Sequence, residues 1–290
     1  MTTDSIVRAR PSRTGKDRLK SVIKHTMVIA VALVMIYPLL WMIASSLRPN
    51  EIIFREPGIL LDTFETENYT EGWNALANPF NVYLVNSALV VLGSIIGNLV
   101  SCSMAAYAFA RLDFRFKKTA FALMLVTIML PFHVVIIPQY IMFSHLGWVN
   151  TFWPLIVPKL LATDAFFIFL MVQFIRSLPN ELYEAARIDG AGHIRQFVQV
   201  TLPLMVPALA TTTIFTFIWT WADFFGPLIY LRSPENYVVP QALNMFIDGQ
   251  STSNYGAMFA MSVVSLIPMF IAFLIGQKFL VKGFAKSGIK

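Results

Sequence analysis

The polar stretch between residues 177 and 203 carries the side chains best suited to specific contacts in an otherwise apolar chain. Pro179 fits the first turn of a helix, where the N–H that proline lacks would have no partner. Carboxylates at Glu181 and Glu184 are favoured there by the helix dipole. Gly190 supplies the left-handed residue at which such helices end. The stretch therefore predicts a helix of about three turns over residues 180–190 that presents acidic groups for docking.

Apolar side chains in the same stretch follow a helical period. They lie at Leu182, Ala185, Ala186 and Ile188 in the first predicted helix, and at Ile194, Phe197, Val198 and Thr201 in a second. Isolated helices this short are marginal in water, so the first must pack against its own membrane domain or against a partner. The alternative role for Glu184 is an internal ion pair with Arg187 at i, i+3, worth about 0.2–0.5 kcal/mol.

The sequence contains no pattern typical of catalysis or metal binding. Cys102 is the only cysteine, which excludes an intrachain disulfide, and the four histidines are scattered without metal-ligand spacing. Gly15 and Lys16 are followed by Asp17 and lack the earlier glycine of a phosphate-binding loop. We therefore expect a chain that is not an enzyme and that binds no metal, ATP or other cofactor itself.

Composition indicates an integral membrane protein. Of the 290 residues, 57% are hydrophobic and only 13% are charged, which is outside the usual range of a soluble domain. We expect an all-α fold in which a six-span domain (26–281) lies between basic tails at 1–25 and 282–290. The first span is too long for the apolar part of a signal peptide. The spans are expected at about residues 26–47, 82–110, 119–143, 165–176, 206–230 and 255–279, with the 177–203 loop between spans four and five.

Two of the apolar stretches have a distinctive pattern. Small residues recur every four positions in the second span, at Gly93, Gly97, Ser101 and Ala105. This spacing favours close packing of another helix in lipid. The fourth stretch is interrupted by Pro158, Lys159 and Asp164. We expect its first part to lie at the membrane interface, or to break, before a span from about residue 165.

Basic residues are distributed unevenly among the connections. Eighteen of the 22 lysines and arginines fall in or next to the two tails, the 111–118 loop and the 177–203 loop. The positive-inside rule therefore predicts that both termini and the 177–203 loop face the cytoplasm, with the chain in the cytoplasmic (inner) membrane. Because topology explains the basic tail, and aromatic residues do not alternate with the basic ones, we expect no nucleic-acid partner.

The 177–203 loop resembles the signature loop of ABC importer permease subunits. The match consists of Glu184-Ala185-Ala186, then Gly190 after three residues, then Val200-Thr201-Leu202-Pro203 after nine more. Val200 stands where the family usually has isoleucine. The resemblance implies that residues 180–190 form a coupling helix, which seats in a cleft of a cytoplasmic ATPase subunit. ATP and magnesium would be bound by that partner.

The resemblance assigns coupling contacts to a compact set of residues in this loop. Glu184 matches the signature glutamate that faces basic groups of the ATPase, and a carboxylate in a partly dry cleft can accept charge-assisted hydrogen bonds from arginine. The alanines after it let the two surfaces approach, and Gly190 makes the turn. The expected coupling residues are Glu181, Glu184, Ala185, Ala186, Asp189 and Gly190.

Other stretches resemble the second permease subunit of carbohydrate importers of the maltose and trehalose type. The similarity runs from about residue 26 to the C-terminus and includes Asn86-Ser87, residues 106–111, Leu130-Pro131, Ile137-Pro138, Phe169-Leu170, Gln173-Phe174 and residues 221–228. It implies ATP-driven import of a sugar or sugar derivative by alternating access. The implied partners are a second homologous permease chain, two ATPase subunits, an extracytoplasmic solute-binding protein and the lipid bilayer.

Candidate substrate contacts gather near the end of the fifth expected span, because sugar faces stack on aromatic rings and sugar hydroxyls need polar partners. Asp223 is the only acid in a span expected to be continuous, and an ionisable group in a membrane is a functional candidate. Aromatic residues at a span end equally form an interfacial belt. The candidates are Trp219, Trp221, Asp223 and Phe224, with Asn86 and Gln139 weaker.

One departure from the family pattern and three alternatives bear on the substrate. The family usually has Trp-Asn where this chain has Trp221-Ala222, so any contact made by that asparagine is absent. Permeases for glycerol phosphate or polyamines share much of the signature. A gradient-driven secondary transporter would be expected to show inverted repeats and buried ionisable pairs at mid-membrane, where the sequence offers only Asp223. No motif identifies the sugar or the partner subunits.

Overall fold

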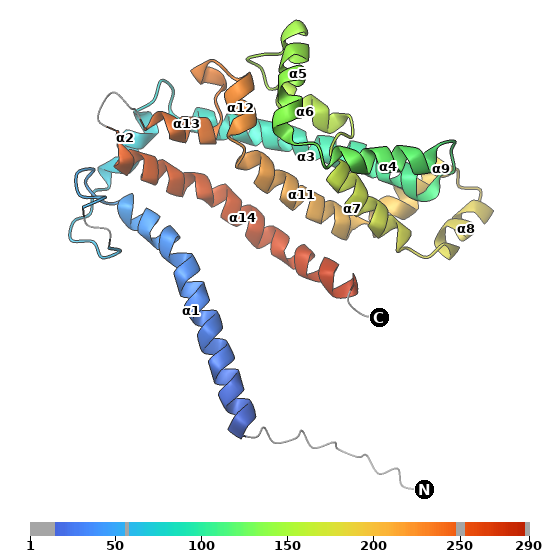
Figure 1. Cartoon of the computed structure of the whole chain (residues 1–290), viewed down its shortest axis with the longest axis horizontal. Coiled ribbons are helices and arrows are strands. Elements are labelled where there is room, and N and C mark those ends of the chain that lie inside the picture. The colour runs from blue at the N-terminus through green and yellow to red at the C-terminus, as the bar shows by residue number, and fades with distance from the viewer. Residues whose placement is uncertain (1–14, 56–57, 248–252, 288–290) are drawn as a thin grey trace.

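Helix α3 (Phe80–Arg111) runs through the middle of the bundle and packs against helices from several parts of the chain (Figure 1). The computed structural model describes residues 15–55, 58–247 and 253–287. Within these ranges every regular element is helical, which confirms the all-α prediction. The other α-helices are α1 (Gly15–Ser45), α2 (Glu67–Asn74), α4 (Lys117–Thr127), α5 (Phe132–His145), α6 (Trp153–Leu160), α7 (Ala165–Arg176), α8 (Glu181–Ile188), α9 (His193–Gln196), α10 (Leu202–Leu204), α11 (Val206–Trp221), α12 (Phe225–Tyr230), α13 (Val239–Met245) and α14 (Tyr255–Ser287). A π-helical turn (Phe197–Thr201) and a 3₁₀ turn (Pro234–Asn236) complete the elements of these ranges.

The helices supply enough apolar length for up to six membrane spans. In the described residues, four segments are long and apolar enough to cross alone: Leu19–Ser45, Phe80–Arg111, Trp153–Arg176 and Tyr255–Lys278. Two bent pairs pass the same test together, α4 with α5 and His193–Leu204 with α11. Counting each bent pair as one span gives the six spans expected from composition.

A proline divides the third expected span. α4 ends at Thr127, and α5 begins at Phe132, directly after Pro131. Proline lacks an N–H for the helical ladder, and its ring disfavours the helical conformation of the residue before it. The two helices are consequently bent by 100° to each other. Residues 119–143 thus belong to two helices instead of one.

The fifth expected span is also divided, which corrects the prediction of one continuous helix over residues 206–230. α11 ends at Trp221 and α12 begins at Phe225, so Asp223 lies in the connection between them. One carboxylate oxygen of Asp223 accepts a hydrogen bond from the N–H of Gly226 at 3.1 Å. The acid thereby satisfies one of the N–H groups that lack a partner at the start of a helix.

Small residues bring α6 directly onto α3, as the sequence predicts. A Cβ atom on Gly97 would lie 2.9 Å from the backbone carbonyl carbon of Lys159, and one on Gly93 would lie 2.9 Å from the side chain of Ile156. The Ser101 hydroxyl donates to the carbonyl of Lys159 at 2.6 Å. The expected break in the fourth stretch is present, because α6 ends at Leu160 before α7 begins. Trp153–Arg176 is nevertheless long and apolar enough to cross as one segment, so α6 adds to the span that was expected only from about residue 165.

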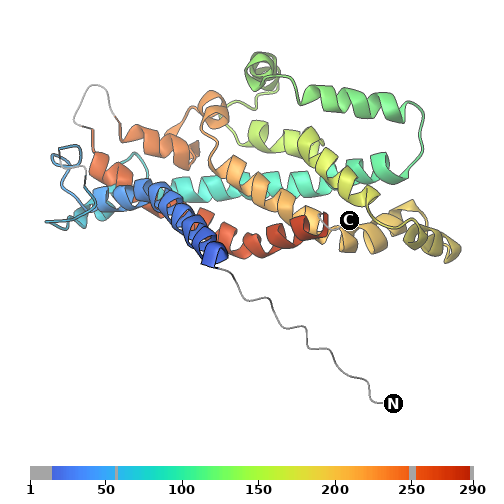
Figure 2. The same ribbon diagram turned by 60° about the horizontal axis from the view of Figure 1, so that its bottom comes forward.

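Two apolar clusters fix the two ends of α3. Near its N-terminus, Phe80 packs in a cluster with Trp221 of α11 and Met261 of α14. Near its C-terminus, Tyr107 packs in a second cluster that includes Met171 of α7. As Figure 2 shows, α2 and α8 lie at opposite ends of the bundle. The first cluster lies at the α2 end and the second at the α8 end.

Helix α1 diverges from the bundle and meets it near its own C-terminal end (Figure 1). The Trp41 ring lies 5.3 Å from the ring of Phe259 in α14. After the helix, Phe54 packs edge-on against Tyr255 at 4.8 Å. Most large apolar side chains of α1 are exposed, as the helix lacks neighbours along most of its described length.

Both expected tails overlap with helices. α1 begins at Gly15, so residues 15–25 are helical, and residues 1–14 of the expected N-terminal tail lie outside the described residues. α14 continues to Ser287, which extends it into the tail expected from residue 282; residues 288–290 lie outside the described residues.

Candidate functional site

Arg111, in the last turn of α3, joins that helix to the loop that leads into α8. One terminal nitrogen of its guanidinium donates to the carbonyls of Ile175 (2.7 Å) and Leu178 (2.8 Å). The other donates to the side-chain oxygen of Asn180, the residue before α8. Hydrogen bonds from a charged donor are stronger than neutral ones. The C-terminal end of α7 and the start of α8 are thus attached to the same side chain.

Tyr183 anchors the middle of α8. Its side chain is buried, its ring lies 3.9 Å from the guanidinium carbon of Arg111, and its hydroxyl lies 3.1 Å from that of Thr201. At the C-terminal end, Gly190 has a φ of +78° and ends the helix in the left-handed conformation, as predicted. One face of α8 is therefore fixed to the membrane domain, which leaves the other face available.

The available face of α8 is acidic and partly apolar. Glu181, Glu184, Ala185, Asp189 and Gly190 are exposed, and Ala186 is half-buried. In the described part of the chain no ion pair joins Glu184 to Arg187, so the alternative role for Glu184 is not realised. Ile188 (87% exposed) and Ile194 (82% exposed) lie beside these acids. Carboxylates next to exposed isoleucines are suited to a protein surface that offers basic groups and an apolar pocket.

A small cleft of about 230 Å³ lies between α8, α9 and the end of α3. It is lined by groups of both charges. Its lining residues include Arg111, Asp113, Lys117, Glu184, Arg187 and His193. Glu184 thus borders the cleft and also belongs to the exposed face.

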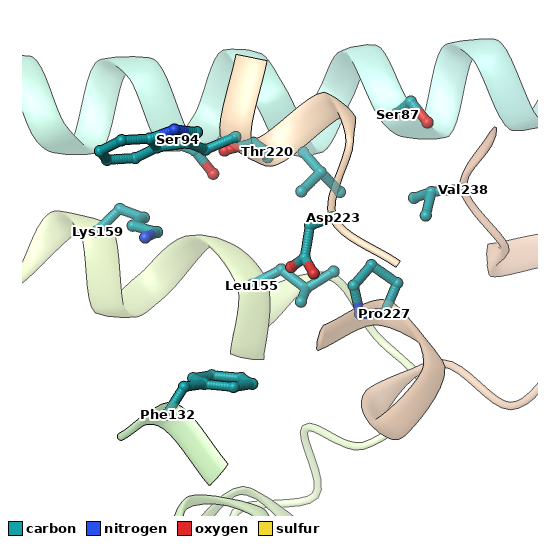
Figure 3. A pocket seen from close by; sticks show the side chains of 11 residues that line it. Ser87, Ser94, Phe132, Leu155, Lys159, Thr220, Asp223, Pro227 and Val238 are labelled. Atoms are coloured by element: carbon teal, nitrogen blue, oxygen red, sulfur yellow. The ribbon is translucent and has the colours of Figure 1, made fainter. Parts of the chain in front are cut away.

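A larger cavity of about 540 Å³ lies between α3, α6 and the connection from α11 to α12 (Figure 3). Its wall is mixed, with an exposed indole at Trp219, hydroxyls at Ser94 and Thr220, and the carboxylate of Asp223. The Ser94 hydroxyl is buried and has no hydrogen-bond partner among the described residues. The remaining lining residues are Ser87, Val90, Phe132, Leu155, Lys159, Pro227 and Val238.

An ion pair borders this cavity at the break between α6 and α7. The Lys159 ammonium lies 3.1 and 2.9 Å from the two carboxylate oxygens of Asp164. The Asn98 amide donates to Asp164 at 2.7 Å and to the Thr216 hydroxyl at 3.1 Å. Asp223 is therefore not the only ionisable group among the packed helices, since this network holds a partly exposed ion pair between α3, α6, α7 and α11.

The six predicted substrate contacts are separated in the structure. Trp219 and Asp223 line the larger cavity. Trp221 is buried in the cluster at the N-terminal end of α3, and its indole N–H donates to the carbonyl of Ser265 at 3.1 Å. The Asn86 amide holds a loop by donating to the carbonyls of Glu235 and Tyr237 at 2.8 and 2.9 Å.

The other two candidates, Phe224 and Gln139, are half-buried and lie outside this lining. Trp221 and Asn86 therefore have structural roles, and Trp219 and Asp223 remain as cavity residues.

Three residues with evident positions in these sites were not singled out by sequence reasoning. Tyr183 is the one buried residue of α8. It lies outside the apolar period of Leu182, Ala185, Ala186 and Ile188, of which the structure leaves all but the half-buried Ala186 exposed. Lys159 appeared only as an interruption of an apolar stretch. Arg111 was grouped with other loop cations, although an arginine in the last turn of a long span followed by a break could have marked it as a helix-end contact.

No group of three or more metal-ligating side chains occurs in the described ranges of the chain. The candidate sites are thus a protein-docking face on α8 and a cavity with aromatic, hydroxyl and carboxylate groups.

Comparisons with known proteins agree with this arrangement. The family model described as binding-protein-dependent transport system inner membrane component matches residues 90–286. The chain is 32% identical over 265 residues to the diacetylchitobiose uptake system permease protein of Streptomyces coelicolor, covering 91% of this chain and 87% of that protein. It is 31% identical over 264 residues to the arabinooligosaccharides transport system permease protein of Halalkalibacterium halodurans, covering 90% and 93%.

A solved structure is similar over nearly the whole chain. It is the crystal structure of a bacterial ABC transporter involved in the import of the acidic polysaccharide alginate, with a TM-score of 0.80 and 22% identity over 93% of this chain and 99% of that one. The likeness shows that the fold is shared. Together with the family match over residues 90–286, it establishes that the chain belongs to the binding-protein-dependent transport system inner membrane components, a family of multi-pass permeases.

Proposed function

We propose that this chain is a permease subunit of an ATP-driven importer for a sugar or sugar derivative. The relatives named for diacetylchitobiose and arabinooligosaccharides support a carbohydrate substrate. The larger cavity supports it as well, because Trp219 offers a ring on which a sugar face can stack, and Thr220 and Asp223 offer a hydroxyl and a carboxylate to its hydroxyl groups. Trp219 and Asp223 are the proposed substrate contacts.

The observation that carries the proposal is the two-sided position of α8. Arg111 and Tyr183 hold one face of the helix against the ends of α3 and α7, while Glu181, Glu184 and Asp189 remain exposed on the other. A helix attached in this way transmits a displacement of its docking partner to the membrane helices. We therefore propose that the predicted residues of α8 make the contacts that couple this chain to an ATPase subunit. Ile188 is added to them as an apolar contact.

The assembly follows from this assignment. Two ATPase subunits that bind ATP and magnesium would dock on α8 and on its counterpart in a second, homologous permease chain. An extracytoplasmic solute-binding protein would deliver substrate at the opposite end of the bundle, near α2 and α13. Arg111, Lys117 and Arg187 line the cleft beside α8, and Arg195 lies in the neighbouring α9, which supports a cytoplasmic position for that end and for both termini.

Other substrates and mechanisms make different predictions for the same preparation. A permease for glycerol phosphate or polyamines would show ATP-dependent uptake of those solutes. The Lys159–Asp164 pair is the feature that a gradient-driven carrier would use, and such a carrier would be indifferent to ATP.

The test is uptake by proteoliposomes that contain this chain and its co-expressed partner subunits, with labelled diacetylchitobiose and arabinooligosaccharides as probes. We expect uptake that requires ATP and that is lost in Glu184→Lys, while the variant chain still inserts and assembles. Glu235→Lys is the matched control, since it makes the same charge reversal at an exposed glutamate at the other end of the bundle. Uptake indifferent to ATP, or unchanged in Glu184→Lys, would contradict the proposal.

A further inference from the structure

Asp223 gives the larger cavity an acidic character. Among the described residues that line this cavity, two carry a charge, Lys159 and Asp223. The Lys159 ammonium is within 3.1 Å of both oxygens of Asp164, a residue outside the lining, so its charge is neutralised where it stands. The carboxylate of Asp223 has no such partner among the described residues. The surface that this chain gives to the cavity therefore has a net negative charge.

The position of the carboxylate leaves one of its oxygens available to a solute. One oxygen accepts the hydrogen bond from the N–H of Gly226, and the other has no hydrogen bond within the described chain. Figure 3 shows the carboxylate directed into the space bordered by Leu155 and Phe132. Apolar walls of this kind lower the local dielectric, which strengthens the interaction of the carboxylate with any charge in the cavity.

The same wall carries a second group without a partner. Ser94 is fully buried, lines the cavity, and has a hydroxyl with no hydrogen-bond partner in the described residues. Buried hydroxyls are normally hydrogen-bonded, and exceptions require an explanation. Ser94 has no exposed surface, so a solute in the cavity would meet Asp223 instead. A solute hydroxyl or amine would donate to the available oxygen of Asp223, whereas a carboxylate or phosphate would be repelled by it.

We propose that Asp223 sets the charge selectivity of the cavity, so that it admits neutral and amine-bearing saccharides and disfavours carboxylated or phosphorylated ones. This inference rests on the proposed function and deepens it by defining the class of sugar. It also separates this chain from a permease for glycerol phosphate. A role confined to capping α12 predicts no such selectivity.

The test measures the charge of the cavity without any saccharide. In the assembled importer, Cys102→Ala removes the native thiol, and Thr220→Cys places a reporter thiol on the cavity wall. The rates of modification by a cationic and an anionic methanethiosulfonate of similar size are compared in detergent, each divided by its rate with a free small thiol. Asp223→Asn removes the charge but keeps an oxygen that can accept from Gly226. Asp113→Asn, at an exposed acid, is the matched control.

We expect the cationic reagent to modify the reporter faster than the anionic one when Asp223 is present. The ratio of the two rates should fall at least about fivefold in Asp223→Asn, since the carboxylate acts at short range through a low dielectric. Asp113→Asn should leave the ratio unchanged, and a second reporter at Phe132→Cys, an exposed position of the lining, should give the same order. A ratio unaffected by Asp223→Asn, or a preference for the anion, would overturn the proposal. So would failure of both reagents to modify either reporter, because the cavity would then be closed to solutes. None of these outcomes alters the ATP-dependent uptake that tests the proposed function.

Discussion

The guanidinium carbon of Arg111 lies 3.9 Å from the centre of the Tyr183 ring, and this contact joins the C-terminal end of α3 to the middle of α8. The same guanidinium donates to two backbone carbonyls at the end of α7. Three elements therefore depend on one side chain. A shift of α8 cannot occur without moving α3 and α7 or breaking these contacts.

Replacing Arg111 should uncouple ATP hydrolysis from transport. Each hydrogen bond to a charged group contributes about 1.5–3 kcal/mol, so Arg111→Ala should free α8 from the bundle. We expect ATP-dependent uptake to fall at least about tenfold, as about 1.4 kcal/mol already corresponds to that factor, while ATPase activity persists. Arg115→Ala is the control, because Arg115 is exposed and lies over the ring of Phe116 alone. Normal uptake in Arg111→Ala would show that α8 is held by other contacts.

Breaking the ion pair between α6 and α7 should destabilise the membrane domain. Lys159→Met leaves the Asp164 carboxylate without its cation, but both side chains are about a quarter exposed. The expected loss of stability is therefore smaller than the value of about 3–5 kcal/mol for breaking a fully buried pair. Lys159→Met with Asp164→Asn should recover part of it. The midpoint of thermal unfolding in detergent measures both effects, and additive losses in the double variant would exclude a coupled pair.

Enlarging Gly97 should push α6 away from α3. The Cβ atom of Gly97→Ala would meet the backbone of Lys159 at 2.9 Å, and backbone cannot rotate aside as a flexible side chain can. Overpacking of this kind costs about 1–3 kcal/mol. Gly192→Ala is the matched control, since Gly192 has a φ of −68° and nothing within 4 Å of its would-be Cβ. Equal thermal unfolding midpoints for the two variants would contradict the close approach of α6.

The two tryptophans at the end of α11 should respond differently to truncation. Trp219→Ala removes a half-exposed ring from the cavity wall that also packs against Phe166, Phe167 and Phe215, so it should weaken apparent affinity for the transported sugar and cost less stability than Trp221→Ala. Trp221→Ala removes a buried ring and should cost about 3–5 kcal/mol of stability. Its apparent affinity should be unchanged when uptake is corrected for the amount of folded protein. The opposite pattern would place Trp221 in the substrate path.

The all-helical fold with several apolar helices was predictable, because apolar length is a strong signal in a membrane protein. The small residues of α3 also predicted a close helix neighbour, and α6 occupies that position. The bends at Pro131 and Asp223 were harder to anticipate. Proline is tolerated in membrane helices, as Pro268 within α14 illustrates. Whether a proline or an acid divides a span is decided by the hydrogen bonds available around it, and these come from tertiary contacts.

The division between cavity and core could not be predicted for the candidate contacts. Trp219 and Trp221 are two residues apart, and nothing in the sequence fixes which side of α11 faces the cavity. Helical period orders residues around an axis but does not orient the axis relative to its neighbours. For α8, the predicted left-handed Gly190 is confirmed, while the coupling role of its acids remains a prediction from the family resemblance.

The contact between α1 and α14 has a consequence for biogenesis. Trp41 and Asn50 find partners far along the chain, the ring of Phe259 and the backbone of Ser253, although Trp41 also packs against Phe54. Contacts between residues so far apart in sequence form late, because the intervening chain must be ordered first. During synthesis α1 emerges before α14, so these contacts can form only after the spans between the two helices have been inserted. The contacts between α1 and α14 therefore form late, although the turn after α1 can join α2 earlier through Asn68.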